Sequence, residues 1–296
     1  MVGPRSLLKK YGFRPKKRMG QNFLLDPSLA AQIVSLAEVD QKDMVLEIGA
    51  GLGALTIPLS QRAKRVWALE ADPALAELLI KEVGLPDNVE LVVADALEFP
   101  FYDLARSRRM KMKVVGNLPY SISSPMIFRL LEHKDSVSSI TLMFQKEVAL
   151  RLIASPGTKE YGPLTVAAQF SAQISLLRLV SCRCFYPRPK VDSALVRMLP
   201  LTRPGMEVED PEVFHEIVRG AFAHRRKTLE NSLALYRPFG LEAKQVSQIV
   251  TRTGWSSRRG EELGLEEFAK LANAFSKYLA GDSKTGRISH KRAQTR

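Results

Sequence analysis

The amino-acid sequence predicts an α/β fold, in which a doubly wound and mostly parallel sheet is followed by a smaller helical domain. Two observations support this prediction. Short apolar segments typical of buried strands alternate with helical patterns as far as Leu199, as in successive βαβ units. From Pro211 onward the apolar residues recur at helical spacing, for example at Phe214, Ile217 and Val218.

The two predicted domains are separated by residues 200–205, a linker rich in proline and charge. We accordingly predict a basic arm and the α/β domain over residues 1–202 and the helical domain over residues 203–283. Residues 284–296 are predicted to form a basic, disordered tail.

Local signals predict the elements of the α/β domain in order. Asp26 followed by Pro27 marks the start of the first helix, because Asp caps helix N-termini and Pro fits the first turn. The strand over residues 44–48 runs into a glycine turn and a helix that ends near Leu59. Further strands are predicted over residues 65–69, 89–94, 113–116, 140–144, 176–180 and 193–199. Further helices are predicted over residues 73–83, 146–153 and 164–173.

The positive charge of the chain is concentrated at its two ends. The chain has 296 residues, of which 45% are hydrophobic, and a formal charge of +13. Residues 1–20 carry +7 and residues 281–296 carry +4, which leaves +2 for residues 21–280. Basic ends around a nearly neutral body suit a nucleic-acid partner, because each neutralised phosphate releases counterions. Ends that merely maintain solubility are the alternative.

The cysteine content and hydropathy predict a reduced, cytoplasmic protein. Cys182 and Cys184 are the only cysteines, and on a strand they would share one face. Their spacing matches neither a redox motif nor a zinc pattern, so no metal site is predicted. No apolar segment follows the basic N-terminus and no run of 18 apolar residues occurs, so we expect neither export nor a membrane span.

Polar residues lie at the carboxyl ends of four successive predicted strands. They are Glu47, Glu70, Asp95 and Asn117. The carboxyl ends of parallel strands share one edge of an open α/β sheet, and ligands of such folds bind at that edge. We therefore expect the four side chains to face one crevice.

The glycine turn at residues 49–53 points to a particular cofactor. A dinucleotide site would place its third glycine one position later, so the spacing disfavours a pyrophosphate. Glu47 would repel a phosphate but suits the cationic part of S-adenosylmethionine. Glu70 lies where a carboxylate can bind both ribose hydroxyls, and Asp95 with Ala96 can accept from an adenine amine. Solvated strand ends are the alternative for each acid taken singly.

The segment Asn117-Leu118-Pro119-Tyr120 combines an amide, a proline-stiffened backbone and an aromatic ring. The Asn117 amide and the Leu118 carbonyl can accept the two hydrogens of an adenine amine, while Tyr120 covers one face of the base and Phe185 the other. Stacking of this kind contributes roughly 1–3 kcal/mol per base. An ordinary turn for the segment, and a core position for Phe185, are the alternatives.

Taken together, the motifs resemble those of the ribosomal RNA adenine N6-dimethyltransferases over nearly the whole chain, most closely the bacterial KsgA/RsmA branch. The matching segments are residues 20–24, 47–53, 117–120, 185–193 and 224–229. The resemblance implies a Rossmann-like, S-adenosylmethionine-dependent methyltransferase fold and N6,N6-dimethylation of two adjacent adenosines near the 3′ end of 16S ribosomal RNA, in the assembling 30S subunit. We also expect a monomer.

The resemblance assigns cofactor contacts to Gln21, Asn22, Leu24, Gly49, Glu70, Asp95 and Asn117. The residue patterns add Glu47, Gly51 and Ala96 to this set, and the catalytic candidates are Asn117, Leu118, Tyr120 and Phe185. The RNA-binding candidates are Arg14, Lys16, Lys17 and Arg18 in the arm, and Arg225, Arg226 and Lys227 at the end of an apolar-striped helix.

Two other functions remain open at this point. A macrolide-resistance methyltransferase would modify an adenine of 23S ribosomal RNA with the same signatures. A ribosome-assembly or transcription factor would keep the fold and bind RNA without turnover. A nicotinamide dehydrogenase fits least, given the glycine spacing.

Overall fold

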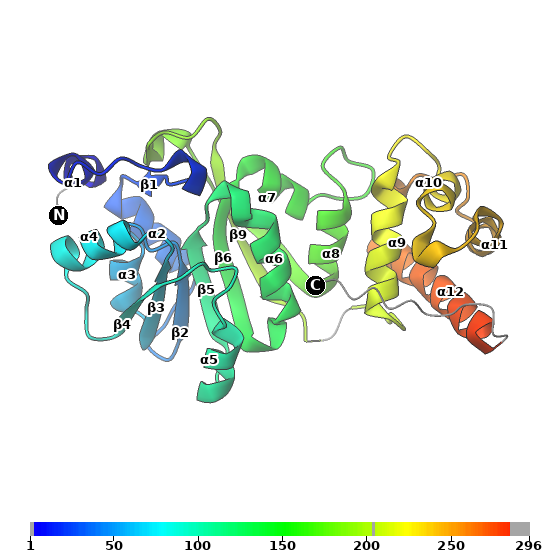
Figure 1. Ribbon diagram of the computed structural model, residues 1–296, viewed down its shortest axis with the longest axis horizontal. Helices are drawn as coiled ribbons and strands as arrows, with labels where there is room; N and C mark the ends of the chain where they lie inside the picture. Colours follow the sequence, from blue (N-terminus) through cyan, green and yellow to red (C-terminus); the bar gives the residue numbers. More distant parts are fainter. Residues whose placement is uncertain (1–2, 203–204, 285–296) are drawn as a thin grey trace. The chain divides into compact units, whose positions relative to one another are not determined.

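The computed structural model describes residues 3–202 and 205–284, which divide into two units (Figure 1). Of the described residues, the first unit comprises residues 3–153 and 171–202, and the second comprises residues 154–170 and 205–284. The predicted basic tail lies outside the described residues apart from Lys284, which ends the last helix. None of the described helices is long and apolar enough to cross a bilayer.

The first unit is built on a seven-stranded sheet with the order β4-β3-β2-β5-β6-β9-β7. The strands are β2 (Met44–Ile48), β3 (Arg65–Glu70), β4 (Val89–Val93), β5 (Met112–Asn117), β6 (Val137–Gln145), β7 (Ala172–Val180) and β9 (Ser193–Pro200). Strands β2, β3, β4, β5 and β6 are parallel to one another, whereas β9 is antiparallel to both β6 and β7. The doubly wound sheet is thus confirmed, with an antiparallel edge.

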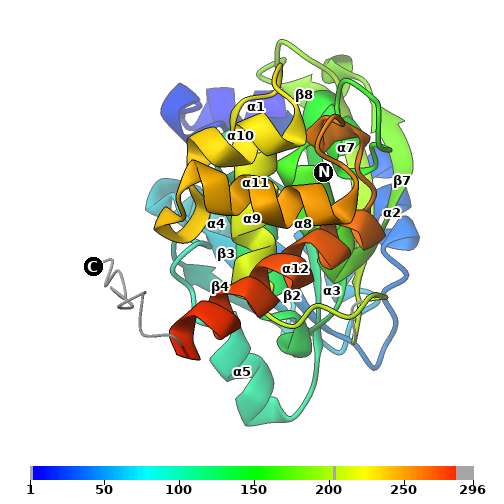
Figure 2. The ribbon, with the colours of Figure 1, turned by 90° about the vertical axis from the view of Figure 1, so that its right-hand side faces the viewer.

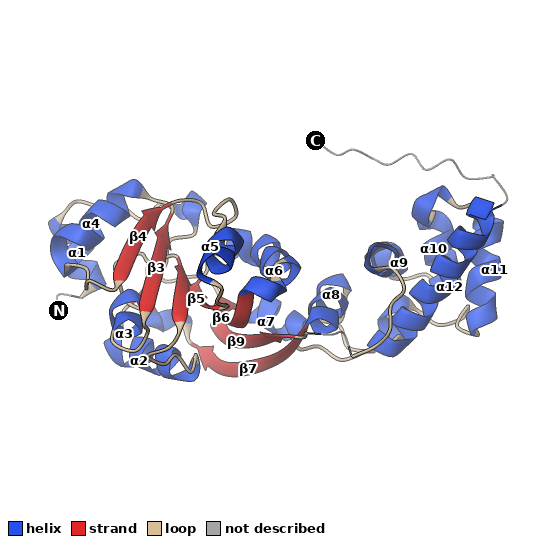
Figure 3. Cartoon of the chain, turned by 90° about the horizontal axis from the view of Figure 1, so that it is seen from below, coloured by secondary structure: helices blue, strands red, loops and turns tan. Residues whose placement is uncertain are grey.

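Helices cover both faces of this sheet, as Figure 3 shows. One face carries α2 (Pro27–Leu36) and α3 (Thr56–Ser60), and the other carries α5 (Phe101–Arg108) and α6 (Ser123–Glu132). Helix α4 (Pro73–Val83) contributes Leu79 to the same core cluster as residues of α2 and α3. The Asp26 side chain accepts from the Ser28 N–H, which confirms the predicted cap of α2. From β2 the chain builds the sheet in one direction, through β3 and β4, and then returns to add β5 on the opposite side of β2. The strand order therefore reverses between β2 and β5, which is where ligands of such folds bind.

Gly116 sets the approach of the two strands at this switch point. It pairs with Ile48, and a Cβ atom on Gly116 would lie 2.5 Å from the Ile48 carbonyl oxygen. Any side chain here would push β5 away from β2. The missing side chain therefore lets both strands end side by side, with Asn117 next to Gly49.

An N-terminal arm precedes the sheet and includes α1 (Pro4–Lys10), a 3₁₀ turn (Lys17–Met19) and β1 (Phe23–Leu24). Strand β1 pairs with β8 (Phe185–Tyr186) in a separate two-stranded sheet. Leu7 and Leu8 of α1 are buried, so the predicted basic arm has an apolar anchor. Cys182 and Cys184 lie in a 3₁₀ turn and not on a strand, because the Ser181 side chain accepts from the Arg183 N–H and starts the turn.

The second unit is helical, as predicted from Pro211 onward (Figure 2). Its helices are α9 (Pro211–Ala223), α10 (Leu229–Tyr236), α11 (Ala243–Thr253) and α12 (Leu265–Lys284). Residues 154–170, which include most of α8 (Pro163–Ser171), also belong to it, unlike in the predicted boundary at residue 202. Val166 and Phe170 pack in the helical core, and the buried Tyr161 hydroxyl donates to the Leu263 carbonyl at 2.8 Å.

The remaining elements are short. They are α7 (Lys146–Leu152) and the 3₁₀ turns Tyr120–Ile122, Lys134–Ser136, Cys182–Cys184, Pro238–Gly240 and Gly260–Glu262.

Candidate active site

A cavity of about 890 Å³ lies in the first unit, where β2 and β5 end. The glycine turn, Glu70 and Asn117 contribute to its wall together with the N-terminal arm. The sequence-predicted residues that line it are Arg18, Gln21, Asn22, Leu24, Glu47, Gly49, Gly51, Glu70, Asp95, Ala96, Asn117, Leu118 and Tyr120. All four polar strand ends thus meet in one crevice, as expected.

The glycine turn adopts backbone conformations that favour glycine. Gly49, Gly51 and Gly53 have φ values of +81°, +55° and +80°. The N–H groups of Gly49 and Ala50 both donate to the Leu69 carbonyl at 2.9 Å, which fastens the turn to β3. A Cβ atom on Gly53 would lie 2.7 Å from Leu79 Cδ1. All three glycines line the cavity, and the close approach of Leu79 leaves no room for a side chain on Gly53.

Glu70 is held by two backbone N–H groups at the end of β3. Its Oε2 accepts from Gly51 N at 2.8 Å and its Oε1 from Asp72 N at 2.9 Å. Burial raises the pKa of the Glu70 carboxyl, and these two N–H groups counteract the shift. Each oxygen can accept a second hydrogen bond. The carboxylate is thus fixed in orientation and can still bind a pair of hydroxyls.

Asp95 follows β4 and is exposed, whereas Ala96 is buried. Asp95 Oδ1 accepts from the Leu97 N–H at 2.8 Å, which fixes the side chain in a turn. Both residues line the cavity, on the β4 side of the sheet edge.

Glu47 is the most deeply buried carboxyl group of the cavity wall. It is 1% exposed, and neither carboxylate oxygen has a hydrogen-bond partner among the described residues. Burial raises its pKa to about 8; the Thr56 hydroxyl nearby opposes this shift without reaching hydrogen-bond geometry, and the Glu70 carboxylate adds to it. A buried carboxyl without a partner suits a ligand that brings a positive charge. The acid therefore fits the ammonium group of S-adenosylmethionine.

The Asn117 amide is oriented by the arm. Its Nδ2 donates to the Asn22 carbonyl at 2.9 Å, while Asn22 Nδ2 donates to the Gly20 carbonyl at 2.9 Å. The amide oxygen of Asn117 is consequently left as an acceptor on a fixed group. Leu118 follows with its side chain buried, and the 3₁₀ turn then begins at Tyr120.

Tyr120 lines the cavity and is half-buried. Its hydroxyl lies 3.0 Å from Ser193 Oγ, a contact that links the turn to β9. Burial raises the pKa of the Tyr120 phenol, so that the hydroxyl stays protonated. The ring is therefore an uncharged stacking surface with a tethered edge.

The prediction that Phe185 covers the second face of a base disagrees with this structure. Phe185 is 3% exposed, packs in the core with Leu29 and Ile33, and is not part of the cavity wall. The pairing of β8 with β1 places it opposite Leu24, inside the fold. Phe185 thus occupies the core position that the sequence left as the alternative.

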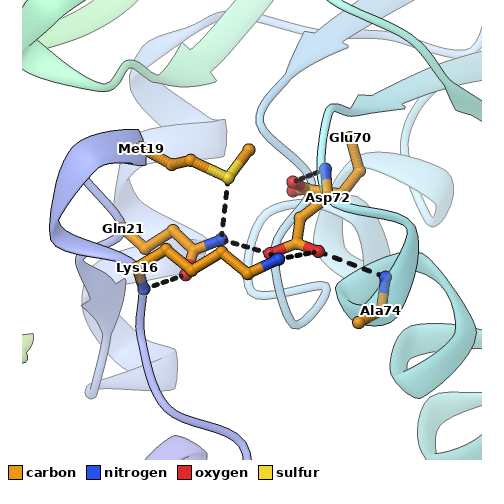
Figure 4. Close-up of polar contacts among 6 residues, drawn as sticks. All are labelled: Lys16, Met19, Gln21, Glu70, Asp72 and Ala74. Atoms are coloured by element: carbon orange, nitrogen blue, oxygen red, sulfur yellow. Dashed lines mark hydrogen bonds and ion pairs between the residues drawn. The ribbon is translucent and has the colours of Figure 1, made fainter.

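Gln21 lines the cavity, but protein groups occupy both ends of its amide. Its Oε1 accepts from Lys16 N at 2.7 Å and its Nε2 donates to Asp72 Oδ2 at 2.8 Å (Figure 4). Lys16 Nζ also contacts the Asp72 carboxylate at 2.9 Å. Lys16 is therefore not free for RNA in this arrangement. The sequence analysis did not identify Asp72. Its only signal in the sequence is its position before Pro73, which is typical of a helix N-cap.

The other basic candidates are all exposed, and one of them, Arg225, is also bonded to protein groups. Arg14, Lys17 and Arg18 of the arm are exposed, and so are Arg226 and Lys227. Arg225 donates to the Glu261 carboxylate at 3.0 Å and to the carbonyls of Lys159 and Tyr161 at 2.6 and 3.0 Å. It holds the segment before α8 to the helical unit.

The chain is similar to known proteins in both sequence and fold. Residues 12–254 match the family model described as ribosomal RNA adenine dimethylase. A "Ribosomal RNA small subunit methyltransferase A" from Desulfotalea psychrophila is 40% identical over 93% of this chain and 96% of its own length. The protein of that name from Clostridium botulinum is 41% identical over 92% of this chain and 98% of its own length.

Two solved structures show the same architecture. A dimethyladenosine transferase from Plasmodium falciparum is 27% identical with a TM-score of 0.73, over 86% of this chain and 98% of that one. The 23S rRNA methyltransferase ErmE is 28% identical with a TM-score of 0.64, over 86% of this chain and 99% of that one. With its Rossmann-like sheet and its match over most of its length, the chain belongs to the ribosomal RNA adenine dimethylase family and is an rRNA adenine dimethyltransferase.

Proposed function

We propose that the protein transfers methyl groups from S-adenosylmethionine to N6 of two adjacent adenosines near the 3′ end of 16S ribosomal RNA. It would do so as a cytoplasmic monomer on the assembling 30S subunit. The small-subunit target is supported by the names of the relatives at 40% and 41% identity. The single observation that carries the chemistry is the fixed Asn117 amide, whose oxygen is left to accept a hydrogen bond beside the glycine turn.

The residues around the cavity fit the proposed cofactor. Glu70 is placed for two ribose hydroxyls, Asp95 and Ala96 for the adenine, and the unpartnered Glu47 for the ammonium group. S-adenosylmethionine supplies an electrophilic methyl group on a sulfonium, and its leaving group is a neutral thioether. A strong general base is therefore not needed at this site.

Asn117 and Leu118 would make the target amine nucleophilic. The lone pair of an adenine amine is delocalised into the ring, which makes the nitrogen a poor nucleophile. When the Asn117 oxygen and the Leu118 carbonyl accept its hydrogens, the nitrogen can pyramidalise and direct its lone pair at the methyl group. Positioning of this kind provides effective molarities of about 10⁵ M or more. Tyr120 would stack on the base once it leaves its helix.

Similarity to the 23S rRNA methyltransferase ErmE supports the alternative of a 23S rRNA target. Its 28% identity is lower than the 40% identity to a small-subunit relative. A factor that binds RNA without turnover is the alternative of another class. Incubation with labelled S-adenosylmethionine and with 30S or 50S particles that lack the modification distinguishes the three. We expect four methyl groups on two adjacent adenosines of 16S RNA.

Each other outcome overturns a defined part of the proposal. Label confined to 50S particles would exclude the small-subunit target. Cofactor and particle binding without label would favour the non-catalytic factor. The Asn117→Ala variant is the matched control, since label that persists in it would remove Asn117 from the mechanism.

A further inference from the structure

One short segment of the arm connects the two halves of the candidate site. This segment, Lys16–Asn22, is here called the strap. Two of its side chains, Lys16 and Gln21, bind the Asp72 carboxylate, at 2.9 and 2.8 Å (Figure 4). The main-chain carbonyl of Asn22, the residue after Gln21, accepts from Asn117 Nδ2 at 2.9 Å. The strap therefore contacts both Asp72, which follows β3, and Asn117, which ends β5.

The fastening of the strap to Asp72 is buried. The Asp72 side chain is 0% exposed, whereas the Lys16 side chain is 40% exposed. Burial alone would raise the pKa of Asp72, but the hydrogen bonds from Lys16, Gln21 and the Ala74 N–H more than offset this and lower it. Asp72 is thus a charged group in the folded protein. Removal of Lys16 would leave a buried carboxylate without its counter-charge, which is costly.

Asp72 is joined directly to the carboxylate proposed to bind the cofactor ribose. The Asp72 N–H donates to Glu70 Oε1 at 2.9 Å, and Glu70 Oε2 accepts from Gly51 N at 2.8 Å. A shift of Asp72 would therefore change the orientation of Glu70 and the glycine turn. The chain of contacts from Lys16 to Glu70 contains no gap.

Gly20 of the strap lies close to Pro119, in the segment Asn117-Leu118-Pro119-Tyr120. Gly20 has a φ of +60°, and a Cβ atom there would lie 3.2 Å from Pro119 Cβ. Asn22 Nδ2 donates to the Gly20 carbonyl at 2.9 Å, which closes a turn just before the carbonyl that holds Asn117. Movement of the strap would thus release the Asn117 amide.

We propose that Asp72 is a positioning residue and that the Lys16–Asp72 pair fastens the strap, so that cofactor binding at Glu70 and the orientation of the Asn117 amide are coupled. The coupling rests on the proposed function, because it takes S-adenosylmethionine as the ligand of Glu70. A coupling between two sites is reciprocal. Binding of the cofactor therefore orders the strap, and an ordered strap raises the affinity for the cofactor.

The proposal separates Lys16 from its basic neighbours. Lys17 and Arg18 belong to the strap as well, but both are exposed and remain available to phosphate groups. RNA that binds these two residues would hold the strap in the conformation that the cofactor prefers. Lys16 would serve the cofactor side of the same segment.

The test compares single variants of the full-length protein. Lys16→Ala removes the counter-charge and leaves the cap of α4 intact, since that cap is Asp72 Oδ1 accepting from Ala74 N. Asp72→Asn removes the charge but keeps a side chain that caps helices well. Lys16→Arg preserves the charge. Lys9→Ala is the matched control, because Lys9 is an exposed arm lysine on α1 outside the strap.

Two measurements give the result. Calorimetry with S-adenosylhomocysteine measures affinity without turnover, and hydrogen exchange of the strap amides measures its order. We expect Lys16→Ala and Asp72→Asn to weaken binding by about fivefold or more, the lower end of usual coupling. Lys16→Arg should restore binding and Lys9→Ala should leave it unchanged. The ligand should slow exchange of the strap in the wild type and much less in Lys16→Ala.

Equal affinity in Lys16→Ala and Lys9→Ala, or strap exchange that the ligand does not alter, would overturn the coupling while leaving the proposed function in place. A folded wild-type protein that does not bind S-adenosylhomocysteine would overturn the proposed function and the coupling together. The two failures are therefore distinguishable.

Discussion

The side-chain amide of Asn117 donates to the main-chain carbonyl of Asn22 at 2.9 Å, across a sequence separation of 95 residues. This bond fixes which end of the amide faces the cavity, since the donor end is used within the protein. We expect Asn117→Ala to lower kcat by about 10²–10³-fold, the usual cost of removing one fixed polar group from a transition state. RNA binding should stay within about twofold, as measured by filter binding. Loss of RNA binding together with turnover would mean that the residue is structural.

Glu47 should make stability depend on pH. Its pKa is about 8 in the folded protein against 4.5 as the ordinary value, so the unfolded chain loses this proton first as pH rises. The folded state therefore loses stability between pH 4.5 and about pH 8, by up to about 5 kcal/mol. We expect Glu47→Gln to unfold at higher denaturant concentration than the wild type at pH 8.5 and at nearly the same concentration at pH 5. A constant difference at both pH values would contradict this origin.

Cofactor binding should release a proton from Glu47. At pH 7 the carboxyl with a pKa of about 8 is mostly protonated, and a bound ammonium group would lower that pKa. We expect close to one proton released per S-adenosylmethionine, measured by calorimetry in buffers with different ionisation enthalpies. Glu47→Gln should abolish the release. Binding enthalpy that is independent of the buffer in the wild type would place the ammonium group elsewhere.

Phe185 and Tyr120 should separate stability from turnover. Phe185→Ala removes a ring that is 3% exposed, so we expect a loss of about 3–5 kcal/mol in the free energy of unfolding. Tyr120→Leu keeps an apolar side chain at a half-buried position and should reduce turnover with a smaller loss of stability. Chemical denaturation and methyl-transfer rates check both variants. If Phe185→Ala kept the wild-type stability but bound the target base more weakly, Phe185 would after all stack on the base.

Arg225 should behave differently from the two basic residues that follow it. Arg225→Ala removes three hydrogen bonds to residues 159, 161 and 261, so we expect lower thermal stability. Arg226→Ala and Lys227→Ala remove exposed charges and should leave stability within about 0.5 kcal/mol. If these two bind RNA phosphates, each substitution should also reduce the salt dependence of RNA binding by about one unit of slope. The slope of affinity against salt concentration is the measurement.

The sequence predicts the sheet and its polar edge well because both depend on local patterns. Apolar runs bounded by turns gave the strands, and the rule that parallel strands end at one edge brought Glu47, Glu70 and Asn117 together. Asp72 and Lys16 could not be found in this way, since their contact joins segments that no periodicity relates. Phe185 illustrates the same limit: its pairing with β1 sets its direction, and a two-residue strand leaves no alternation to read.

The helical unit is built from two separate segments of the described chain, residues 154–170 and residues 205–284. The unit is therefore not a single C-terminal segment. A recombination at the linker alone would transfer only part of it. Val166 and Phe170 would then meet a foreign set of helices, or water, in place of their own partners. A functional exchange of the helical unit would therefore have to carry both segments at once.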